Sequence, residues 1–145
     1  MNQVNKVVVR YKDGRIVKGT TRDFIPGKAL FHVEVAGKDE TIEVNVEDLK
    51  AIFFVKDFGG KPDYVEAKSF SDSGSGKGKK ILVEFKDGET LTGYTLGYDA
   101  NRPGFFVMPS DERSNNERVY VVRSAVANVA IGQKADQMVN PKSSI

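Results

Sequence analysis

The chain of 145 residues contains no cysteine, no tryptophan and a single histidine, His32. Without cysteine there are no disulfide bonds, no thiolate nucleophiles and no cysteine-ligated zinc or iron–sulfur centres. With one histidine, a Ser–His–Asp triad or a histidine-rich metal site has little material to be built from. We therefore predict a protein that is not an enzyme, with no metal site and no cofactor, and we expect His32 at a surface or an interface.

The sequence also lacks a long apolar run and a strong excess of one charge. No apolar stretch approaches the roughly 18 residues of a membrane-spanning helix, and the start of the chain lacks a signal-peptide pattern. We expect a cytoplasmic protein with no membrane contact. Lysine and arginine number 22 against 20 aspartate and glutamate, giving a net charge of +2. Non-specific nucleic-acid binders usually carry a basic excess on one face, which disfavours that function but leaves room for a local patch.

What the sequence does contain is a repeat of about half its length. The segment KVVVRYKDGRIVKGTT begins at Lys6, and the segment KILVEFKDGETLTGYT begins at Lys80. A shift of 74 positions superimposes Asp13-Gly14 on Asp87-Gly88, and a shift of 77 aligns the segments that follow a short insertion. Self-similarity of this kind describes architecture before chemistry. It predicts two related units of roughly 60 residues, each marginally stable alone.

Each unit has the pattern of short β-strands. Apolar and polar residues alternate over 7–11 and over 81–85, which is the period of a half-buried strand. The Asp-Gly pairs that follow predict tight hairpins with type I′ turns. Gly19 and Gly93, at matched positions in the return strands, predict a bend or a bulge. Further strands are expected at residues 29–35, 41–46 and 50–56, and at 104–108, 118–123 and 127–131.

From these strands we predict an all-β protein of two tandem small SH3-like or Sm-like five-stranded barrels, produced by an internal duplication. The first barrel covers residues 1–58 and the second covers residues 80–132. Residues 59–79 are rich in glycine and serine and are expected to form a flexible linker. Residues 133–145 are polar and are expected to form a disordered tail.

Two resemblances follow from these segments. VRYKDGRIVKGTTRDF and VEFKDGETLTGYTLGY resemble the first motif of Sm-like proteins, and DLKAIFFVKDF and RVYVVRSAVANVAI occupy the place of the second. Over about residues 5–131 the chain also resembles bacterial tandem β-barrel domains of unknown function, which implies no activity. The Sm-like resemblance implies RNA binding through an asparagine after the central aromatic residue and an Arg-Gly pair. Asn101 after Tyr98 is a partial match, and neither unit has the Arg-Gly pair.

Two polar segments are candidates for binding. The end of the linker carries a basic cluster that could contact a phosphate backbone; it does not fit a Walker loop, because no helix follows and glycine stands where Ser or Thr is needed. The second unit has an inserted polar loop at 110–117, where a scaffold can present binding residues, although its Asn-Asn pair also fits a plain turn. The candidate binding residues are Lys77, Lys79, Lys80, Tyr98, Arg102, Asn115, Asn116 and Arg118.

Three phenylalanines that lie close together, Phe53, Phe54 and Phe58, indicate an interaction surface. Alternation buries at most one face of a strand, and here the other face still carries an aromatic ring. We expect these rings to be buried between the two units or between protomers. We interpret the protein as a non-enzymatic binding or scaffolding module for a protein or a small ligand, with a protein partner or self-association. The alternative is RNA binding in the Sm-like manner.

Overall fold

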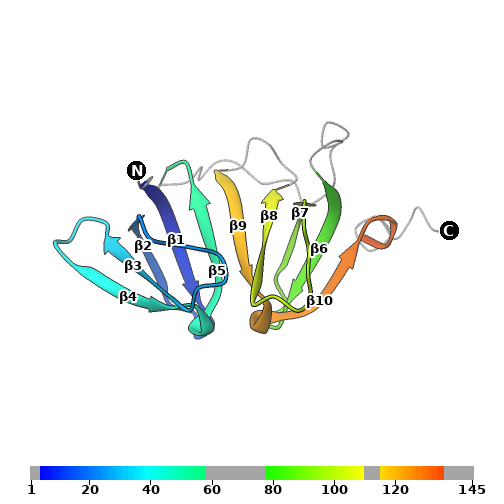
Figure 1. The fold of residues 1–145 in the computed structure, drawn as a ribbon, viewed down its shortest axis with the longest axis horizontal. Helices are drawn as coiled ribbons and strands as arrows, with labels where there is room; N and C mark the ends of the chain where they lie inside the picture. The colour runs from blue at the N-terminus through cyan, green and yellow to red at the C-terminus, as the bar shows by residue number, and fades with distance from the viewer. Residues whose placement is uncertain (1–3, 58–77, 110–114, 136–145) are drawn as a thin grey trace.

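The computed structural model describes residues 4–57, 78–109 and 115–135. Within them the chain forms ten β-strands, two short 3₁₀ turns and a helical turn at 133–135, so the predicted all-β class is confirmed. All ten strands belong to one antiparallel sheet, in the order β10-β6-β7-β8-β9-β5-β1-β2-β3-β4 (Figure 1). The strands are β1 (Asn5–Tyr11), β2 (Ile16–Thr21), β3 (Leu30–Val35), β4 (Thr41–Asn45), β5 (Leu49–Val55), β6 (Lys79–Phe85), β7 (Thr90–Thr95), β8 (Gly104–Pro109), β9 (Asn116–Val122) and β10 (Val126–Ile131).

The hairpins predicted at the Asp-Gly pairs are present, but the predicted type I′ turn is wrong. Gly14 has a φ of 97°, and no other type of residue in the described parts of the chain has positive φ, so Asp13 does not. The N–H of Gly14 donates to the carbonyl of Tyr11 at 3.1 Å, and Asp13 Oδ1 accepts from the N–H of Arg15 at 3.0 Å. This is a turn closed by a glycine in the left-handed region, which forms a bulge at the start of β2.

The matched glycines inside β2 and β7 allow a close approach of neighbouring backbone. A Cβ atom on Gly19 would lie 2.3 Å from the carbonyl oxygen of Glu34, and one on Gly93 would lie 2.1 Å from that of Met108. These distances are far below van der Waals contact, so any side chain would force adjacent strands apart. The irregularities in strand register lie elsewhere, where β5 meets β1, where β5 meets β9 and where β10 meets β6.

The two halves of the sheet have the same strand order and the same register. The β1–β5 pair Val9 and Ile52 corresponds to the β6–β10 pair Val83 and Val129, at shifts of 74 and 77 positions. The same shifts relate the other strand pairs of the two halves. The 3₁₀ turns, η1 (Val46–Asp48) and η3 (Arg123–Ala125), also occupy equivalent places. A residue of the first half and the residue 74 or 77 positions later therefore have equivalent strand partners in their own halves.

The halves are joined by β5 and β9, which run side by side in the middle of Figure 1. This pairing makes the ten strands one sheet that is not closed, and the two tandem five-stranded barrels that we expected are not confirmed. Within the described residues, β4 and β10 are the free edges of this sheet. Both β5 and β9 are buried on two faces because each contributes to both cores. The first-half core includes Tyr120 and Val122 of β9, and the second-half core includes Ala51 of β5, with Phe53 packed against it.

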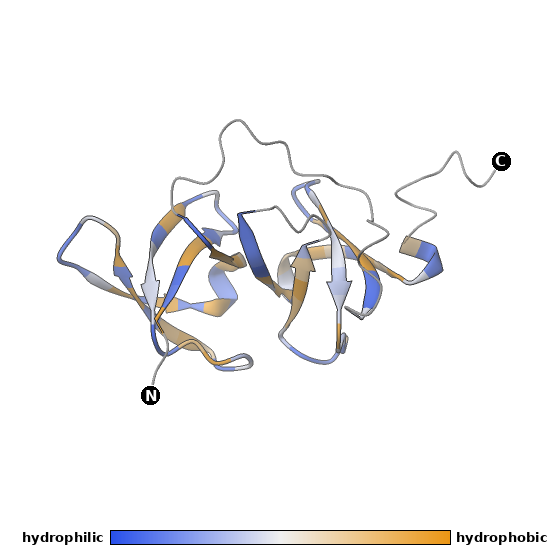
Figure 2. Ribbon diagram, turned by 90° about the horizontal axis from the view of Figure 1, so that it is seen from above, coloured by the Kyte–Doolittle hydropathy of each residue, from blue (hydrophilic) through white to orange (hydrophobic). Residues whose placement is uncertain are grey.

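Viewed from above, the halves lie next to each other, with hydrophilic residues at the tip of the β3–β4 hairpin (Figure 2). The predicted linker coincides largely with residues 58–77, outside the described residues, and Lys79 belongs to β6. Of the predicted tail, residues 136–145 also lie outside the described residues. Residues 133–135 form the helical turn, and there Ala135 is buried against Leu82 and Ala130.

Candidate functional site

A cavity lies where four strand ends meet at the junction of the halves. β1 and β9 begin at this end of the sheet, and β5 and β8 end there (Figure 1). Asn115 ties the ends together: its side chain accepts from the N–H of Asp57 at 3.0 Å and donates to the carbonyl of Asp57 at 2.8 Å. The N–H of Lys56 also donates to the carbonyl of Asn115 at 2.9 Å. The start of β9 is thereby fixed against the end of β5.

The cavity at this end, which we call the junction pocket, has a volume of about 470 Å³. It is lined by Val4, Asn5, Lys6, Phe54, Val55, Lys56, Met108, Glu117 and Arg118. Three of these side chains are cationic and one is anionic, although the chain as a whole is nearly balanced in charge. The pocket is therefore a local positive site built from both halves.

Arg118 is the best-positioned cation of the junction pocket. Its guanidinium carbon lies 4.4 Å from the ring centroid of Phe54 and 5.2 Å from that of Phe106. Within the described residues no carboxylate forms an ion pair with it. Contact between a guanidinium and ring faces is favourable, and a guanidinium held in this way can still use its in-plane N–H donors for hydrogen bonds. Arg118 is therefore prepared to bind an anionic oxygen.

The two rings that Arg118 contacts belong to a larger cluster of aromatic side chains. Phe24, from the loop after β2, lies edge-on to Phe31 at 5.2 Å, to Phe54 at 5.7 Å and to Tyr120 at 5.0 Å between ring centroids. Phe106 completes the cluster, at 6.0 Å from Phe54 and 5.2 Å from Tyr120. Burial raises the pKa of the Tyr120 hydroxyl, and a backbone hydrogen bond from Gly27 opposes that rise. Rings from both halves thus pack against one another next to the Arg118 guanidinium.

The opposite end of the junction is held by charges that pair across the halves. Lys50 Nζ contacts Asp87 Oδ2 at 2.8 Å and also pairs with Glu89, and it lies 4.8 Å from the ring centroid of Phe85. The hydrogen bond from Lys50 holds the pKa of Asp87 below its usual range. A smaller cavity of about 250 Å³ opens here. Because its buried lysine already has two carboxylate partners, we assign this end a structural role.

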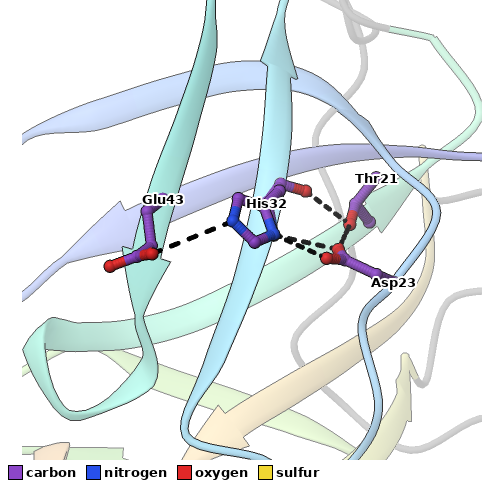
Figure 3. A network of polar contacts seen from close by, with 4 residues as sticks. All are labelled: Thr21, Asp23, His32 and Glu43. Atoms are coloured by element: carbon purple, nitrogen blue, oxygen red, sulfur yellow. Dashed lines mark hydrogen bonds and ion pairs between the residues drawn. The ribbon is translucent and has the colours of Figure 1, made fainter.

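The single histidine lies in an exposed polar network on β3 (Figure 3). His32 Nδ1 is 2.7 Å from Asp23 Oδ2, and Nε2 is 3.9 Å from Glu43 Oε2. Partial burial raises the pKa of Asp23, but hydrogen bonds from the backbone and side chain of His32 outweigh it and lower that pKa. The Thr21 hydroxyl donates to the His32 carbonyl at 2.8 Å, not to the imidazole. The network therefore does not have the nucleophile–base contact of a triad.

The structure brings together some of the predicted binding residues and separates others. Asn115, Asn116 and Arg118 lie at the junction, where Val55 pairs with Asn116 and Phe54 pairs with Arg118. Of the predicted interface residues, Phe53 and Phe54 lie on β5 at the junction, while Phe58 lies outside the described residues.

The remaining predicted residues lie away from the junction pocket. Lys79 and Lys80 begin β6, where they pair with residues at the end of β7. Tyr98 packs edge-on against Phe105 at 4.9 Å, in the place that Phe24 has in the first half, and Arg102 lies 3.7 Å from Asp99. Lys77 is outside the described residues.

Sequence reasoning missed Lys6, Lys56 and Phe106 as members of this site. Lys56 directly follows the aromatic strand and could have been suspected from that position, whereas nothing local distinguishes Lys6. Within residues 4–57, 78–109 and 115–135, no group of three His, Asp or Glu side chains is placed to hold a metal ion. None of the helical segments in these ranges has the length and apolar character needed to cross a membrane.

Fold and site together define an all-β protein with one open ten-stranded sheet and a cationic cavity at the junction of its halves. Residues 3–132 match a family of unknown function, DUF6982, and the chain belongs to this family. No curated protein and no solved structure matches the chain. Because family membership here carries no activity, the function has to be argued from the site itself.

Proposed function

We propose that this protein is a non-enzymatic binding module and that its junction pocket binds an anionic group of a protein or a small ligand. The observation that carries the proposal is Arg118, which is stacked on two phenylalanine rings beside two lysines in a pocket of about 470 Å³. A guanidinium presents paired N–H donors whose spacing matches a carboxylate or a phosphate. Lys6 and Lys56 add positive charge on the same cavity wall.

The size and rigidity of the pocket support this role. Ligand sites usually occupy about 300–1,000 Å³ and combine an apolar lining with a few well-placed polar groups. Phe54, Val55 and Met108 supply apolar lining here, and the ends of β5 and β9 are tied by the hydrogen bonds of Asn115. A preformed site loses little conformational entropy when it binds.

RNA binding is the second candidate, because the same cations could contact a phosphate backbone. Recognition of single strands also needs exposed aromatic faces beside a basic groove. The rings near Arg118 pack against one another, and Tyr98 packs on Phe105, which leaves less aromatic surface for base stacking. The packing therefore favours an anionic group on a protein or small molecule over an RNA strand.

The test is isothermal titration calorimetry with three probes: inorganic phosphate, an oligoglutamate peptide and a short oligouridine. The variant is Arg118→Gln, and the control is Arg22→Gln, an exposed arginine that lies 3.8 Å from Glu34 and outside the junction pocket. A hydrogen bond to a charged group contributes about 1.5–3 kcal/mol. We expect Arg118→Gln to weaken binding of phosphate or oligoglutamate by about tenfold or more, and Arg22→Gln to leave it unchanged.

Equal binding by the wild type and Arg118→Gln, or an equal loss in both variants, would contradict the proposal. Much tighter binding of oligouridine, with affinity that falls steeply as salt is added, would favour the RNA alternative. The proposal also keeps four expectations: that each half is an SH3-like or Sm-like barrel unit, that the two halves arose by internal duplication, that the protein acts in the cytoplasm, and that it has a protein partner.

A further inference from the structure

The junction joins two different kinds of strand edge. Because the halves share one strand order, β4 of the first half is the equivalent of β9, and β10 of the second half is the equivalent of β5. The two free edges, β4 and β10, lie at opposite ends of Figure 1. Since they correspond to β9 and β5, β10 of one molecule could in principle pair with β4 of another as β5 pairs with β9. A head-to-tail contact of this type can be repeated from molecule to molecule without limit unless something prevents it.

On β4 the residues that would form such a contact are polar. Glu43 pairs with His32 as Tyr120 pairs with Phe106, and Asn45 occupies the place of Val122. At the junction, Tyr120 and Val122 are each 2% exposed and belong to the first-half core. A repeated contact at β4 would bury the Glu43 carboxylate and the Asn45 amide in these apolar positions. Burial of such groups without compensating partners is strongly unfavourable.

On β10 the residue equivalent to Phe53 of β5 is a small alanine, and another part of the chain already covers it. Ala130 pairs with Leu82 as Phe53 pairs with Val8, so Ala130 stands where the junction has a phenylalanine. The helical turn after β10 packs Ala135 on Ala130 and Leu82. This turn is fixed by the N–H of Gly132, which donates to the carbonyl of Lys80 at 2.8 Å. The face of β10 that corresponds to the Phe53 face of β5 is therefore covered by the helical turn of the same chain.

We infer that β4 and β10 are terminating edges, which prevent copies of this chain from repeating the β5–β9 junction between molecules. The polar residues of β4 and the covered face of β10 act on opposite sides of the same contact, so either one alone would block it. Each molecule then has one junction and one junction pocket. This inference rests on strand register and burial, and it holds whether or not the pocket binds an anion.

The test converts each edge into the corresponding junction strand in the full chain. One variant carries Glu43→Tyr and Asn45→Val on β4. The other carries Asn128→Ala and Ala130→Phe on β10, together with Ala135→Asp, which removes the apolar contact that packs the covering turn on β10. Masses are measured by size-exclusion chromatography with light scattering, and circular dichroism checks that every variant is folded. A control pair, Glu34→Tyr with Asn101→Val, adds similar apolar groups at exposed positions that belong to neither edge strand, β4 or β10.

We expect the wild type, the control and each single-edge variant, when measured by itself, to be monomeric at every concentration. An equal mixture of the two single-edge variants should show a doubled mass and nothing larger, because each partner keeps one terminating edge. A chain that combines the substitutions of both edges should form longer assemblies. Assembly of the wild type as concentration rises would overturn the inference, and so would a folded combined variant that stays monomeric. Self-assembly of a single-edge variant as strong as that of the mixture would overturn the head-to-tail pairing.

Discussion

Replacement of Phe54 by alanine removes a side chain that contacts aromatic rings from both halves. Phe54 is 3% exposed, and its ring centroid lies 5.7 Å from that of Phe24 and 6.0 Å from that of Phe106. Truncation of a buried phenylalanine costs about 3–5 kcal/mol, and aromatic pairs of this geometry add about 0.5–1.5 kcal/mol each beyond their buried area. We expect Phe54→Ala to lower the free energy of unfolding by about 4 kcal/mol.

The assay is urea unfolding followed by far-ultraviolet circular dichroism, since the chain has no tryptophan to report by fluorescence. In a thermal scan the same loss corresponds to a fall in Tm of roughly 8–16 °C for a domain of this size. The matched control is Leu96→Ala, which shortens an apolar side chain that is 78% exposed. Surface changes of that kind usually stay within about 0.5 kcal/mol.

The form of the transition also tests the reasoning. Because each core includes residues of the other half, wild type and Phe54→Ala should each unfold in a single cooperative step. A loss below about 1 kcal/mol would show that the ring is not packed as described. Two separate transitions, one of them unchanged by the substitution, would show that the halves are independently stable and would refute a shared junction.

Two further predictions follow from the strand geometry and the charges of the junction. Gly93→Ala should lower the free energy of unfolding by about 1–3 kcal/mol or more, because the new Cβ would lie 2.1 Å from the carbonyl oxygen of Met108. In the control Gly97→Ala nothing lies within 4 Å of the new atom, so the loss measured by urea unfolding should be much smaller. Equal losses in the two variants would contradict the close approach at Gly93. Lys50 lowers the pKa of Asp87, so the stability from this pair is present above the unfolded pKa of about 3.9 and is lost as pH falls through the folded pKa. The urea midpoints of wild type and Lys50→Met, measured between neutral and strongly acidic pH, should therefore converge on the acid side, and parallel curves would refute the pairing.

Local signals in the sequence predicted the strands and hairpins because those signals act over a few residues. Alternation over 7–11 and the Asp-Gly pair after it gave β1 and its turn. The turn type was predicted wrongly because it depends on register. Arg10 pairs with Ile16, which leaves a longer loop than a two-residue turn, and that loop needs positive φ only at Gly14. Alternation within a strand does not determine the loop length.

The junction could be predicted only in part. Two adjacent phenylalanines indicated that both faces of β5 need burial, but they did not indicate which strand edge supplies it. The pocket depends on that choice, because it combines residues 4–6, 54–56, 108, 117 and 118, which are far apart in the chain. A cavity of this kind results from non-local pairing and has no local pattern of its own. The same holds for the free edges, whose polar residues gain meaning only beside their equivalents at the junction.

The most direct test of the central claim is a nuclear magnetic resonance titration of uniformly ¹⁵N-labelled protein with inorganic phosphate, with the arginine Nε–Hε signals recorded together with the backbone. If the junction pocket is the binding site, the largest shifts will fall on Lys6, Lys56 and Arg118, which lie in three different strands or strand ends but line one cavity. The Arg118 Nε–Hε signal should move with the same apparent affinity as the backbone signals. Shifts confined to Lys79 and Lys80, or spread evenly over all exposed lysines, would contradict the claim.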